Sequence, residues 1–137
     1  MPAAEHDLLV IGAGPGGYVA ALRAAQLGLN VGCADENELL GGTCLRIGCI
    51  PSKALLESSE KYWEAKNGLA RHGVRVDGVA LDLAAMMRRK DEVVRTLCKG
   101  IEGLFQRGKI TRYQGRARFE GPGRVVIRHV SGETAVH

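Results

Sequence analysis

The chain has few aromatic residues and no long hydrophobic stretch. Its longest apolar run extends from Leu8 to Ala13, far short of the ~20 residues that a membrane-spanning helix needs. It also does not open with a basic segment followed by a long apolar stretch, as a secretory signal does. These absences predict no membrane partner and an intracellular protein. A cytoplasmic location of the bacterial type is favoured over the mitochondrial matrix, because no transit peptide is seen.

The excess of basic over acidic side chains is small. There are 19 Lys and Arg against 15 Asp and Glu, a formal net charge of +4. The basic residues are scattered and are locally dense only at 88–90 and 112–118. No groove-reading motif or set of stacking aromatics accompanies them. We therefore interpret them as a solvated surface and predict no nucleic-acid partner.

Cysteine is rare and unevenly placed, with four residues in the chain. Cys33 and Cys98 each stand alone within an apparent strand or helix, a setting typical of a buried, inert thiol. Cys44 and Cys49 share one short glycine-rich segment. They are too close in sequence to staple distant segments, and without further Cys or His nearby they cannot fill zinc's four-coordinate shell, so no metal site is predicted. A redox role is the stronger interpretation.

The balance of 45% hydrophobic and 25% charged residues is typical of a globular domain. Residue patterns predict two short buried strands enclosing a helix, then two amphipathic helices, then several short strands. The strands are expected at 7–10, 29–34, 110–113, 117–119, 124–130 and 134–137, and the helices at 16–27, 52–70 and 82–106. Asp82 is a suitable N-cap and Gly108 a suitable stop for the last helix. The fold class is therefore α/β, opening with a βαβ unit.

A glycine-rich turn, GAGPGG at 12–17, directly follows the first strand and opens the first helix. It fits the G-x-G-x-x-G fingerprint, in which the first glycine permits a tight turn, the second lets a pyrophosphate approach the backbone, and the third lets helix and strand pack closely. Asp35 ends the second strand, where an acid can accept hydrogen bonds from ribose hydroxyls. An ordinary acid at a surface strand end is the alternative for Asp35. The pattern predicts a dinucleotide but does not separate FAD from NAD.

The segment GGTCLRIGCIPSK carries the closely spaced cysteines. In a regular helix, residues five apart lie roughly 8–9 Å from each other, beyond the ~7 Å Cα separation that a disulfide tolerates. If Cys44 and Cys49 bond, the segment must be distorted. Gly48 supplies flexibility and Pro51 lacks a backbone N–H, so we expect a kinked or interrupted helix. Lys53 follows Cys49 by four positions, and a cation on the same helix face favours the reactive thiolate.

The pattern G-G-T-C-x-x-x-G-C-I-P-S-K, some thirty residues after a G-x-G-x-x-G, resembles the signature of the FAD-dependent pyridine nucleotide-disulfide oxidoreductases. This family includes dihydrolipoamide dehydrogenases, glutathione reductases and mercuric reductases, and the ending IPSK is most similar to the first group. The resemblance implies a Rossmann-like FAD-binding domain with a parallel sheet, a helical excursion and a β-hairpin or meander segment, incomplete at the carboxy terminus.

The resemblance also implies residue roles. Cys44 would exchange with a dithiol substrate, Cys49 would lie against the flavin and pass electrons to it, and Lys53 would sit near the flavin's reactive nitrogen. Asp35 would hold the ADP half of FAD. The complete set of implied FAD-binding residues is Gly12, Gly14, Pro15, Gly17, Asp35, Glu36, Gly41, Gly42, Thr43, Cys44, Lys53, Gly115 and Ala117.

By the same resemblance, residues 1–137 would be the amino-terminal part of the FAD-binding domain, made of a βαβ unit at 7–35, a redox helix and helical pair at 42–107, and a β segment at 109–137. Domains for NAD binding and dimerisation would be absent. The full-length parent would be a homodimer that oxidises dihydrolipoyl groups of 2-oxo acid dehydrogenase complexes or of glycine cleavage and reduces NAD. The chain alone would be inactive and bind FAD weakly. Another member of the family, or a non-catalytic dinucleotide-binding redox module, is the alternative.

Three positions depart from the family pattern. Asp35 stands where Glu is common, which shortens the reach to the ribose without removing the acceptor. Arg46 replaces a usual Asn between the cysteines, and Ala117 replaces a common Gly. None of these argues against flavin binding, but Arg46 changes the setting of the disulfide.

Overall fold

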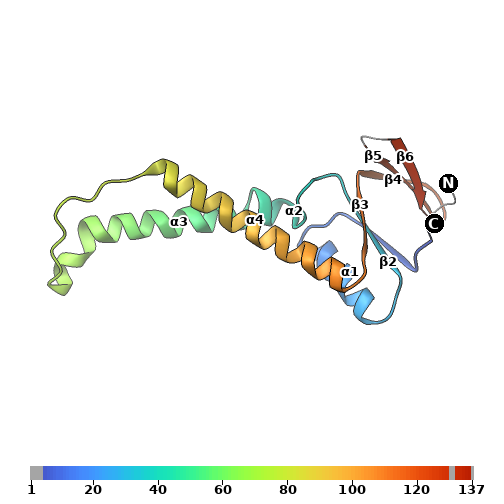
Figure 1. Cartoon of the computed structure of the whole chain (residues 1–137), viewed down its shortest axis with the longest axis horizontal. Helices are drawn as coiled ribbons and strands as arrows, with labels where there is room; N and C mark the ends of the chain where they lie inside the picture. The colour runs from blue at the N-terminus through green and yellow to red at the C-terminus, as the bar shows by residue number, and fades with distance from the viewer. Residues whose placement is uncertain (1–4, 130–131, 137) are drawn as a thin grey trace.

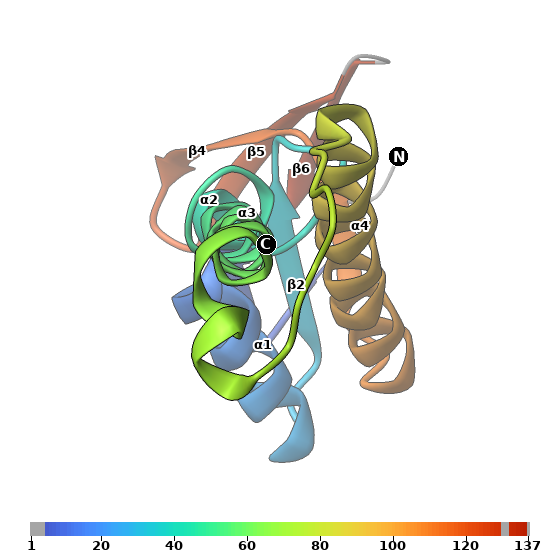
Figure 2. The ribbon, with the colours of Figure 1, turned by 90° about the vertical axis from the view of Figure 1, so that its left-hand side faces the viewer.

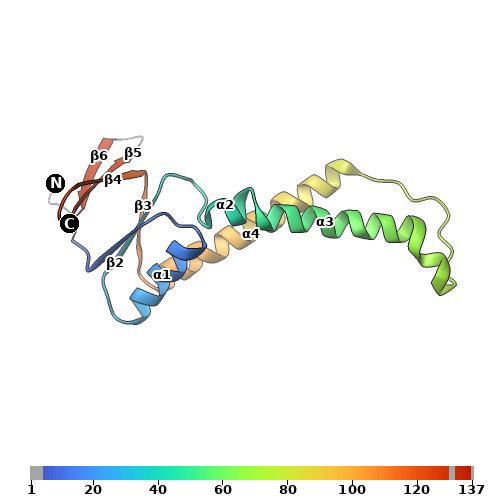
Figure 3. The ribbon, with the colours of Figure 1, turned by 180° about the vertical axis from the view of Figure 1, so that it is seen from behind.

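A computed structural model describes residues 5–129 and 132–136 of the chain. The molecule is elongated, with two small sheets at one end and an arm of two long helices extending from them (Figure 1). The view from behind shows the same arrangement, with a short helix at the junction of arm and sheets (Figure 3). The arm and the sheet end are built from different parts of the sequence and are described in turn.

The predicted βαβ unit is present. Strand β1 (Leu8–Ile11) is followed by helix α1 (Pro15–Gln26) and strand β2 (Val31–Asp35). The two strands pair in parallel, with Leu8 opposite Val31 and Ile11 opposite Ala34. Parallel pairing carries the ends of both strands, and with them the glycine-rich turn and Asp35, to one edge of the sheet.

Strand β3 (Thr111–Gln114) completes this sheet by pairing in parallel with the other side of β2, giving the order β1-β2-β3. All of β2 from Val31 to Ala34 is buried, as predicted. The prediction that the first strand is buried is wrong, because Leu8 is 37% and Ile11 44% exposed. In the sheet β1 is an edge strand, and so it has a neighbour on one side only.

The β segment forms a second, antiparallel sheet. Its strands are β4 (Arg116–Gly121), β5 (Arg124–His129) and β6 (Gly132–Val136), in that order. This confirms the predicted meander and its tight turn, where Gly123 has a φ of +67° that favours glycine. The predicted strands at 124–130 and 134–137 run partly outside the described residues, at Val130 and at His137.

Two core clusters lie on opposite faces of the parallel sheet. Side chains alternate along β2, so that Cys33 faces α1 and the long helix α4 (Leu83–Arg107) while Ala34 faces the antiparallel sheet. The helical side is closed by Ile101 and Phe105 of α4, and the other side by Ile127 of β5. The strand carrying Asp35 is therefore fixed from both sides.

The arm contains the redox segment. Helix α2 (Gly42–Arg46) and helix α3 (Cys49–Trp63) lead to a π-helical turn (Glu64–Gly68) and a 3-10 turn (Leu69–His72), and helix α4 (Leu83–Arg107) returns toward the sheets. The predicted helix at 52–70 therefore begins earlier and changes type before it ends. The expected cap of α4 is confirmed, because the Asp82 carboxylate accepts the N–H of Ala85 at 2.9 Å and Gly108 follows the last helical residue.

Helices α3 and α4 pack side by side along the arm, as the view down it shows (Figure 2). The outer half of α3 nevertheless exposes apolar side chains, with Leu56 59% and Trp63 62% exposed. In this projecting part α3 has α4 along one side, which leaves these side chains uncovered. The inner half, next to the sheets, is where Pro51 and Ala54 are buried.

Candidate functional site

The glycine-rich turn has the geometry that its spacing predicts. Gly12 has a φ of +95°, and a Cβ built on Gly17 would lie 1.7 Å from the carbonyl oxygen of Gly12. These two glycines are therefore required by the protein's own backbone. A Cβ on Gly14, by contrast, would meet only the Cα of Gly42, at 3.9 Å. The packing does not require glycine at position 14, and the bare backbone leaves room for a ligand group.

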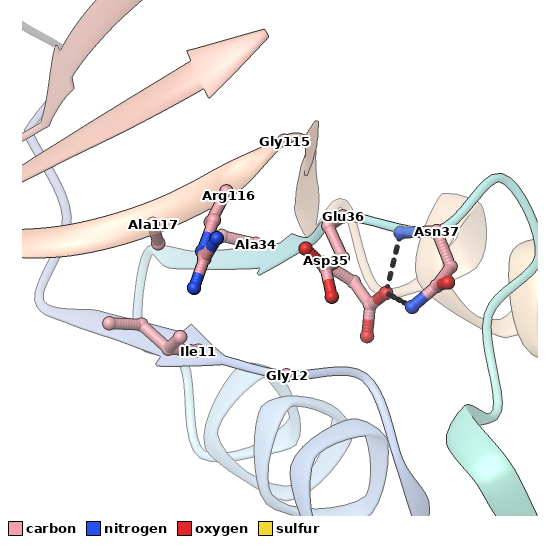
Figure 4. Close-up of a pocket in the computed structure, with 9 residues that line it drawn as sticks. All are labelled: Ile11, Gly12, Ala34, Asp35, Glu36, Asn37, Gly115, Arg116 and Ala117. Atoms are coloured by element: carbon pink, nitrogen blue, oxygen red, sulfur yellow. Dashed lines mark hydrogen bonds between the residues drawn. The ribbon is translucent and has the colours of Figure 1, made fainter.

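A pocket of about 210 Å³ lies beside this turn, where β1 and β2 end (Figure 4). Among the predicted FAD-binding residues, the pocket is lined by Gly12, Asp35, Glu36, Gly115 and Ala117. These residues come from β1, β2 and the start of the β segment, which are far apart in sequence. The remaining lining residues, Ile11, Ala34, Asn37 and Arg116, were not predicted. Their positions follow from strand pairing, except that Asn37, two residues after a strand-end acid, is a recognisable Asx-turn partner.

Asp35 is tied on both carboxylate oxygens. Oδ2 accepts the N–H of Ala13 at 2.7 Å, and Oδ1 accepts both the backbone N–H and the side-chain amide of Asn37, each at 2.8 Å. Burial raises the pKa of Asp35, but the hydrogen bonds from Ala13 and Asn37 and the charge of Arg46 outweigh it and hold the pKa below its ordinary value of 3.8. The carboxylate is therefore ionised and preorganised at the pocket wall.

This lowered pKa makes part of the fold's stability sensitive to acid. The unfolded chain binds the Asp35 proton more readily than the folded chain, so the contribution is complete above the unfolded pKa and is lost as pH falls through the folded pKa. We expect the difference in free energy of unfolding between wild type and Asp35→Asn, measured by urea denaturation, to be constant near neutral pH and to shrink below about pH 4. Parallel pH profiles for the two proteins would contradict the ionised, hydrogen-bonded state of Asp35.

The redox segment is docked on the glycine-rich turn. The N–H of Gly41 donates to the carbonyl of Ala13 at 2.9 Å. A Cβ on Gly42 would lie 2.6 Å from the Cα of Gly14, so the two backbones touch. Gly42 begins α2, which carries Thr43 at an exposed position and then Cys44. The first residues of the cysteine-bearing segment thus lie against the predicted phosphate-binding backbone.

The predicted interruption between the cysteines is confirmed. Helix α2 ends at Arg46, helix α3 begins at Cys49, and Gly48 between them has φ −123° and ψ −111°, outside the helical region. A side chain at Gly48 would also press on the carbonyl of Thr43, at 2.9 Å from a Cβ. Cys44 and Cys49 therefore do not lie on one regular helix.

All four thiols are free in the structure. A hydrogen bond with Cys49 is the main reason that the pKa of Cys44 is raised, with desolvation and the charge of Cys49 adding to it and the charge of Lys53 opposing it. The charge of Lys53 lowers the pKa of Cys44, but its effect is outweighed, and the predicted pairing of Lys53 with Cys49 stays a prediction. The Cys44 and Cys49 side chains are therefore neighbours that influence each other's protonation.

The other two thiols are buried and inert, as expected. Desolvation by burial raises the pKa of Cys33 to about 11, with the nearby Asp35 adding to the shift and Arg112 opposing it. Cys98 is fully buried, and its pKa is likewise raised by burial. Neither thiol is available as a thiolate near neutral pH.

Lys53, Pro15 and Gly115 lie in different settings. Lys53 is exposed on α3, four residues after Cys49, beside a shallow groove that also contains Glu57 and Arg89. Pro15 is the first residue of α1, where a missing N–H costs no hydrogen bond. Gly115 is required by packing, because its Cβ would lie 2.6 Å from the carbonyl oxygen of Arg128. Gly115 lies between β3 and β4, where the chain passes from one sheet to the other. This position explains both its place at the pocket and its close contact with β5.

Within residues 5–129 and 132–136, no cluster of three or more His, Cys, Asp or Glu side chains could hold a metal ion. No described helix is long and apolar enough to cross a membrane.

The chain is similar to known proteins along nearly its whole length. A family model described as pyridine nucleotide-disulphide oxidoreductase matches residues 6–135. The chain is 52% identical over 132 residues to the mitochondrial dihydrolipoyl dehydrogenase of Pisum sativum, covering 96% of this chain and 26% of that protein. It is 54% identical over 129 residues to dihydrolipoyl dehydrogenase 3 of Pseudomonas aeruginosa, covering 93% of this chain and 27% of that one. The chain thus spans about a quarter of the length of these relatives.

The fold also matches a solved structure. An HOCl-induced flavoprotein disulfide reductase from Escherichia coli, in a Cu(II) complex, superposes with a TM-score of 0.78 at 24% identity, over 100% of this chain and 27% of that one. This likeness supports the fold alone: a parallel three-stranded sheet with helices and an antiparallel sheet, as in an FAD-binding Rossmann-like domain. With 130 of its 137 residues matched by the family model, counted from 6 through 135, the chain belongs to the pyridine nucleotide-disulphide oxidoreductase family.

Proposed function

We propose that this chain forms the FAD-binding and disulfide-carrying part of a dihydrolipoamide dehydrogenase. The observation that carries the proposal is the contact between the glycine-rich turn and the cysteine-bearing segment, through the Gly41–Ala13 hydrogen bond and the touching backbones of Gly42 and Gly14. A dinucleotide whose pyrophosphate lies on the turn therefore extends toward the two thiols. The relatives named dihydrolipoyl dehydrogenase favour this member of the family over a glutathione or mercuric reductase.

The residues present fit FAD. Gly14 leaves open backbone at the amino end of α1, where free N–H groups and the helix dipole favour a pyrophosphate. Asp35 offers an ionised acceptor for the ribose at the wall of the pocket. At about 210 Å³ the pocket is smaller than the roughly 300–1,000 Å³ that encloses a drug-sized ligand, so it suits the adenosine end alone. When bound, the flavin supplies a two-electron acceptor for the reduced cysteine pair.

The chain's own chemistry is thiol-disulfide exchange. In the oxidised pair, a thiolate of dihydrolipoamide attacks Sγ of Cys44, the Cys44–Cys49 bond breaks, and Cys49 leaves as a thiolate. The second thiol of the substrate, deprotonated, then attacks its own sulfur in the mixed disulfide, closing lipoamide and releasing Cys44. Two electrons and two protons have left the substrate, and the cysteine pair is reduced. Cys49 would be the thiolate that faces a bound flavin, and Lys53, four residues later on the same helix, would contribute positive charge there.

The substrate class can be tested on the oxidised chain itself. A dithiol closes its own ring and releases Cys44, whereas a monothiol needs a second molecule to do so. We therefore expect dihydrolipoamide to reduce the pair at least about tenfold faster than glutathione at equal thiol concentration, followed by alkylation and mass spectrometry. Cys49→Ser should accumulate the mixed disulfide at Cys44 after reaction with oxidised glutathione, because it lacks the resolving thiol.

Two further outcomes would redirect the proposal. Equal rates for the dithiol and the monothiol would point to another member of the family. Mixed disulfides that form on Cys49 in the Cys44→Ser variant as readily as on Cys44 in Cys49→Ser would mean that Cys44 is not the exchange thiol.

Titration with ADP, followed by shifts of the backbone amides at 12–17, tests the nucleotide pocket separately. An unchanged spectrum at millimolar ADP would rule out the dinucleotide role.

A further inference from the structure

Arg46 lies between the two cysteines, at a position where the family pattern has a neutral amide, and its guanidinium contacts Asn37, outside the cysteine-bearing segment. Its Nη1 donates to Oδ1 of Asn37 at 2.8 Å, and the Asn37 side-chain nitrogen donates to Oδ1 of Asp35 at 2.8 Å. The last residue of α2 is thus joined to the acid at the nucleotide pocket by two hydrogen bonds.

The direction of this chain of bonds is fixed by chemistry. A guanidinium can only donate, so the oxygen of the Asn37 amide must face Arg46. The amide nitrogen then necessarily faces Asp35, whose carboxylate can only accept. Without Arg46 the Asn37 side chain could rotate or turn its oxygen toward Asp35, where two acceptors would repel. Arg46 therefore selects the one orientation of Asn37 that holds the carboxylate.

The consequence for the pocket lies in the oxygens of Asp35. Oδ1 already accepts two N–H groups from Asn37, whereas among residues 5–129 and 132–136 Oδ2 accepts one N–H group, that of Ala13. A carboxylate oxygen accepts about two hydrogen bonds. Oδ2 therefore keeps one free acceptor position, beside the glycine-rich turn.

The other charged groups around Arg46 do not replace this bond. Its side chain shares a groove with Glu38, Asp91 and Arg95, and its Nε is buried without a hydrogen-bond partner among the described residues. Arg95 carries the same charge in the same groove, with no hydrogen bond to Asn37 among the described contacts. Arg46 and Arg95 can therefore be compared as two arginines in one groove, of which Arg46 hydrogen-bonds to Asn37.

We propose that Arg46 is a positioning residue for nucleotide recognition: acting through Asn37, it holds Asp35 with a single open acceptor, Oδ2, for one ribose hydroxyl. The inference rests on the proposed dinucleotide function. It assigns to the segment between the cysteines a role in the pocket at the other end of the cofactor.

The first measurement is ADP binding by NMR titration or calorimetry of the purified chain. We expect Arg46→Ala and Asn37→Ala each to weaken binding by about fivefold or more, the effect of losing one net hydrogen bond. The double variant should be no weaker than Asn37→Ala, because the two residues act in series. Arg46→Lys should recover part of the affinity, and the matched control Arg95→Ala should stay within about twofold of wild type.

The second measurement is the pKa of Asp35, obtained by NMR titration of its carboxyl carbon in the ligand-free protein. The same spectra show whether each variant remains folded. Arg46→Ala and Asn37→Ala should raise the Asp35 pKa, and Arg95→Ala should leave it unchanged.

The outcomes separate the two proposals. Wild type that does not bind ADP would overturn the proposed function and this inference with it. Binding that Arg46→Ala and Arg95→Ala weaken equally, or additive losses in the double variant, would overturn only the inference. An Asp35 pKa that is unchanged in Arg46→Ala would also overturn it, because Asp35 would not then depend on Arg46.

Discussion

Gly17→Ala should unfold the phosphate-binding turn and abolish ADP binding. Its added Cβ would lie 1.7 Å from the carbonyl oxygen and 2.9 Å from the carbonyl carbon of Gly12, both backbone atoms that cannot rotate away. Relief requires α1 to move off the sheet, which opens the core around Ala21 and Val31. We expect a loss of about 3 kcal/mol or more in the free energy of unfolding and a fall in Tm of roughly 10 °C, measured by thermal denaturation.

Gly16→Ala is the matched control one residue earlier. A Cβ there meets nothing within 4 Å, and the position lies inside the first turn of α1. Alanine favours the helix over glycine by up to about 1 kcal/mol, so this variant should be as stable as wild type or more stable. Equal melting temperatures for Gly16→Ala and Gly17→Ala would show that close packing of α1 on the turn is not what position 17 provides.

Oxidation should pair Cys44 with Cys49 completely, and loss of either thiol should abolish the bond. Cys44 and Cys49 are neighbours that influence each other's protonation, and the chain between them is interrupted at Gly48 rather than held on one regular helix. After mild oxidation and alkylation, mass spectrometry should find the loss of two hydrogen atoms on one peptide that contains both residues. Cys44→Ser and Cys49→Ser should each show no intramolecular disulfide.

Cys33→Ser and Cys98→Ser are the controls for this experiment. Both thiols are buried and have raised pKa values, so neither competes as a thiolate. Each variant should form the Cys44–Cys49 bond at the wild-type rate, provided that it remains folded. A disulfide that joins Cys44 or Cys49 to one of the buried thiols in the folded protein would refute the redox pairing.

The glycine-rich turn and the cysteine-bearing segment form one continuous structure. The turn that Gly17 permits supports Gly41 and Gly42, and these in turn begin the helix that carries Cys44. A defect in the turn should therefore reach the thiols, whereas loss of a thiol should leave the turn intact. Measuring disulfide formation in Gly17→Ala, alongside ADP binding in Cys44→Ser, distinguishes these two directions of dependence.

The sequence by itself determined the features that depend on neighbouring residues. The βαβ unit, the tight turn at Gly12 and the N-cap at Asp82 follow from local backbone preferences and short-range hydrogen bonds. The interruption between the cysteines follows from Gly48 and Pro51, which are both poor continuations of a helix. The burial of the isolated cysteines was also predictable, because each stands alone within a predicted strand or helix.

Only the tertiary structure decided which strands share a sheet and which polar groups meet. The run at 111–114 resembles the strands after it, yet it pairs with β2 in the parallel sheet, while the others form a separate antiparallel sheet. Arg112 fixes this crossing by donating to backbone carbonyls after β2. The bonds from Arg46 through Asn37 to Asp35 likewise join residues on different elements. Such contacts depend on how the whole chain packs, so no local sequence pattern predicts them. The orientation of the Asp35 carboxylate was therefore decided by packing.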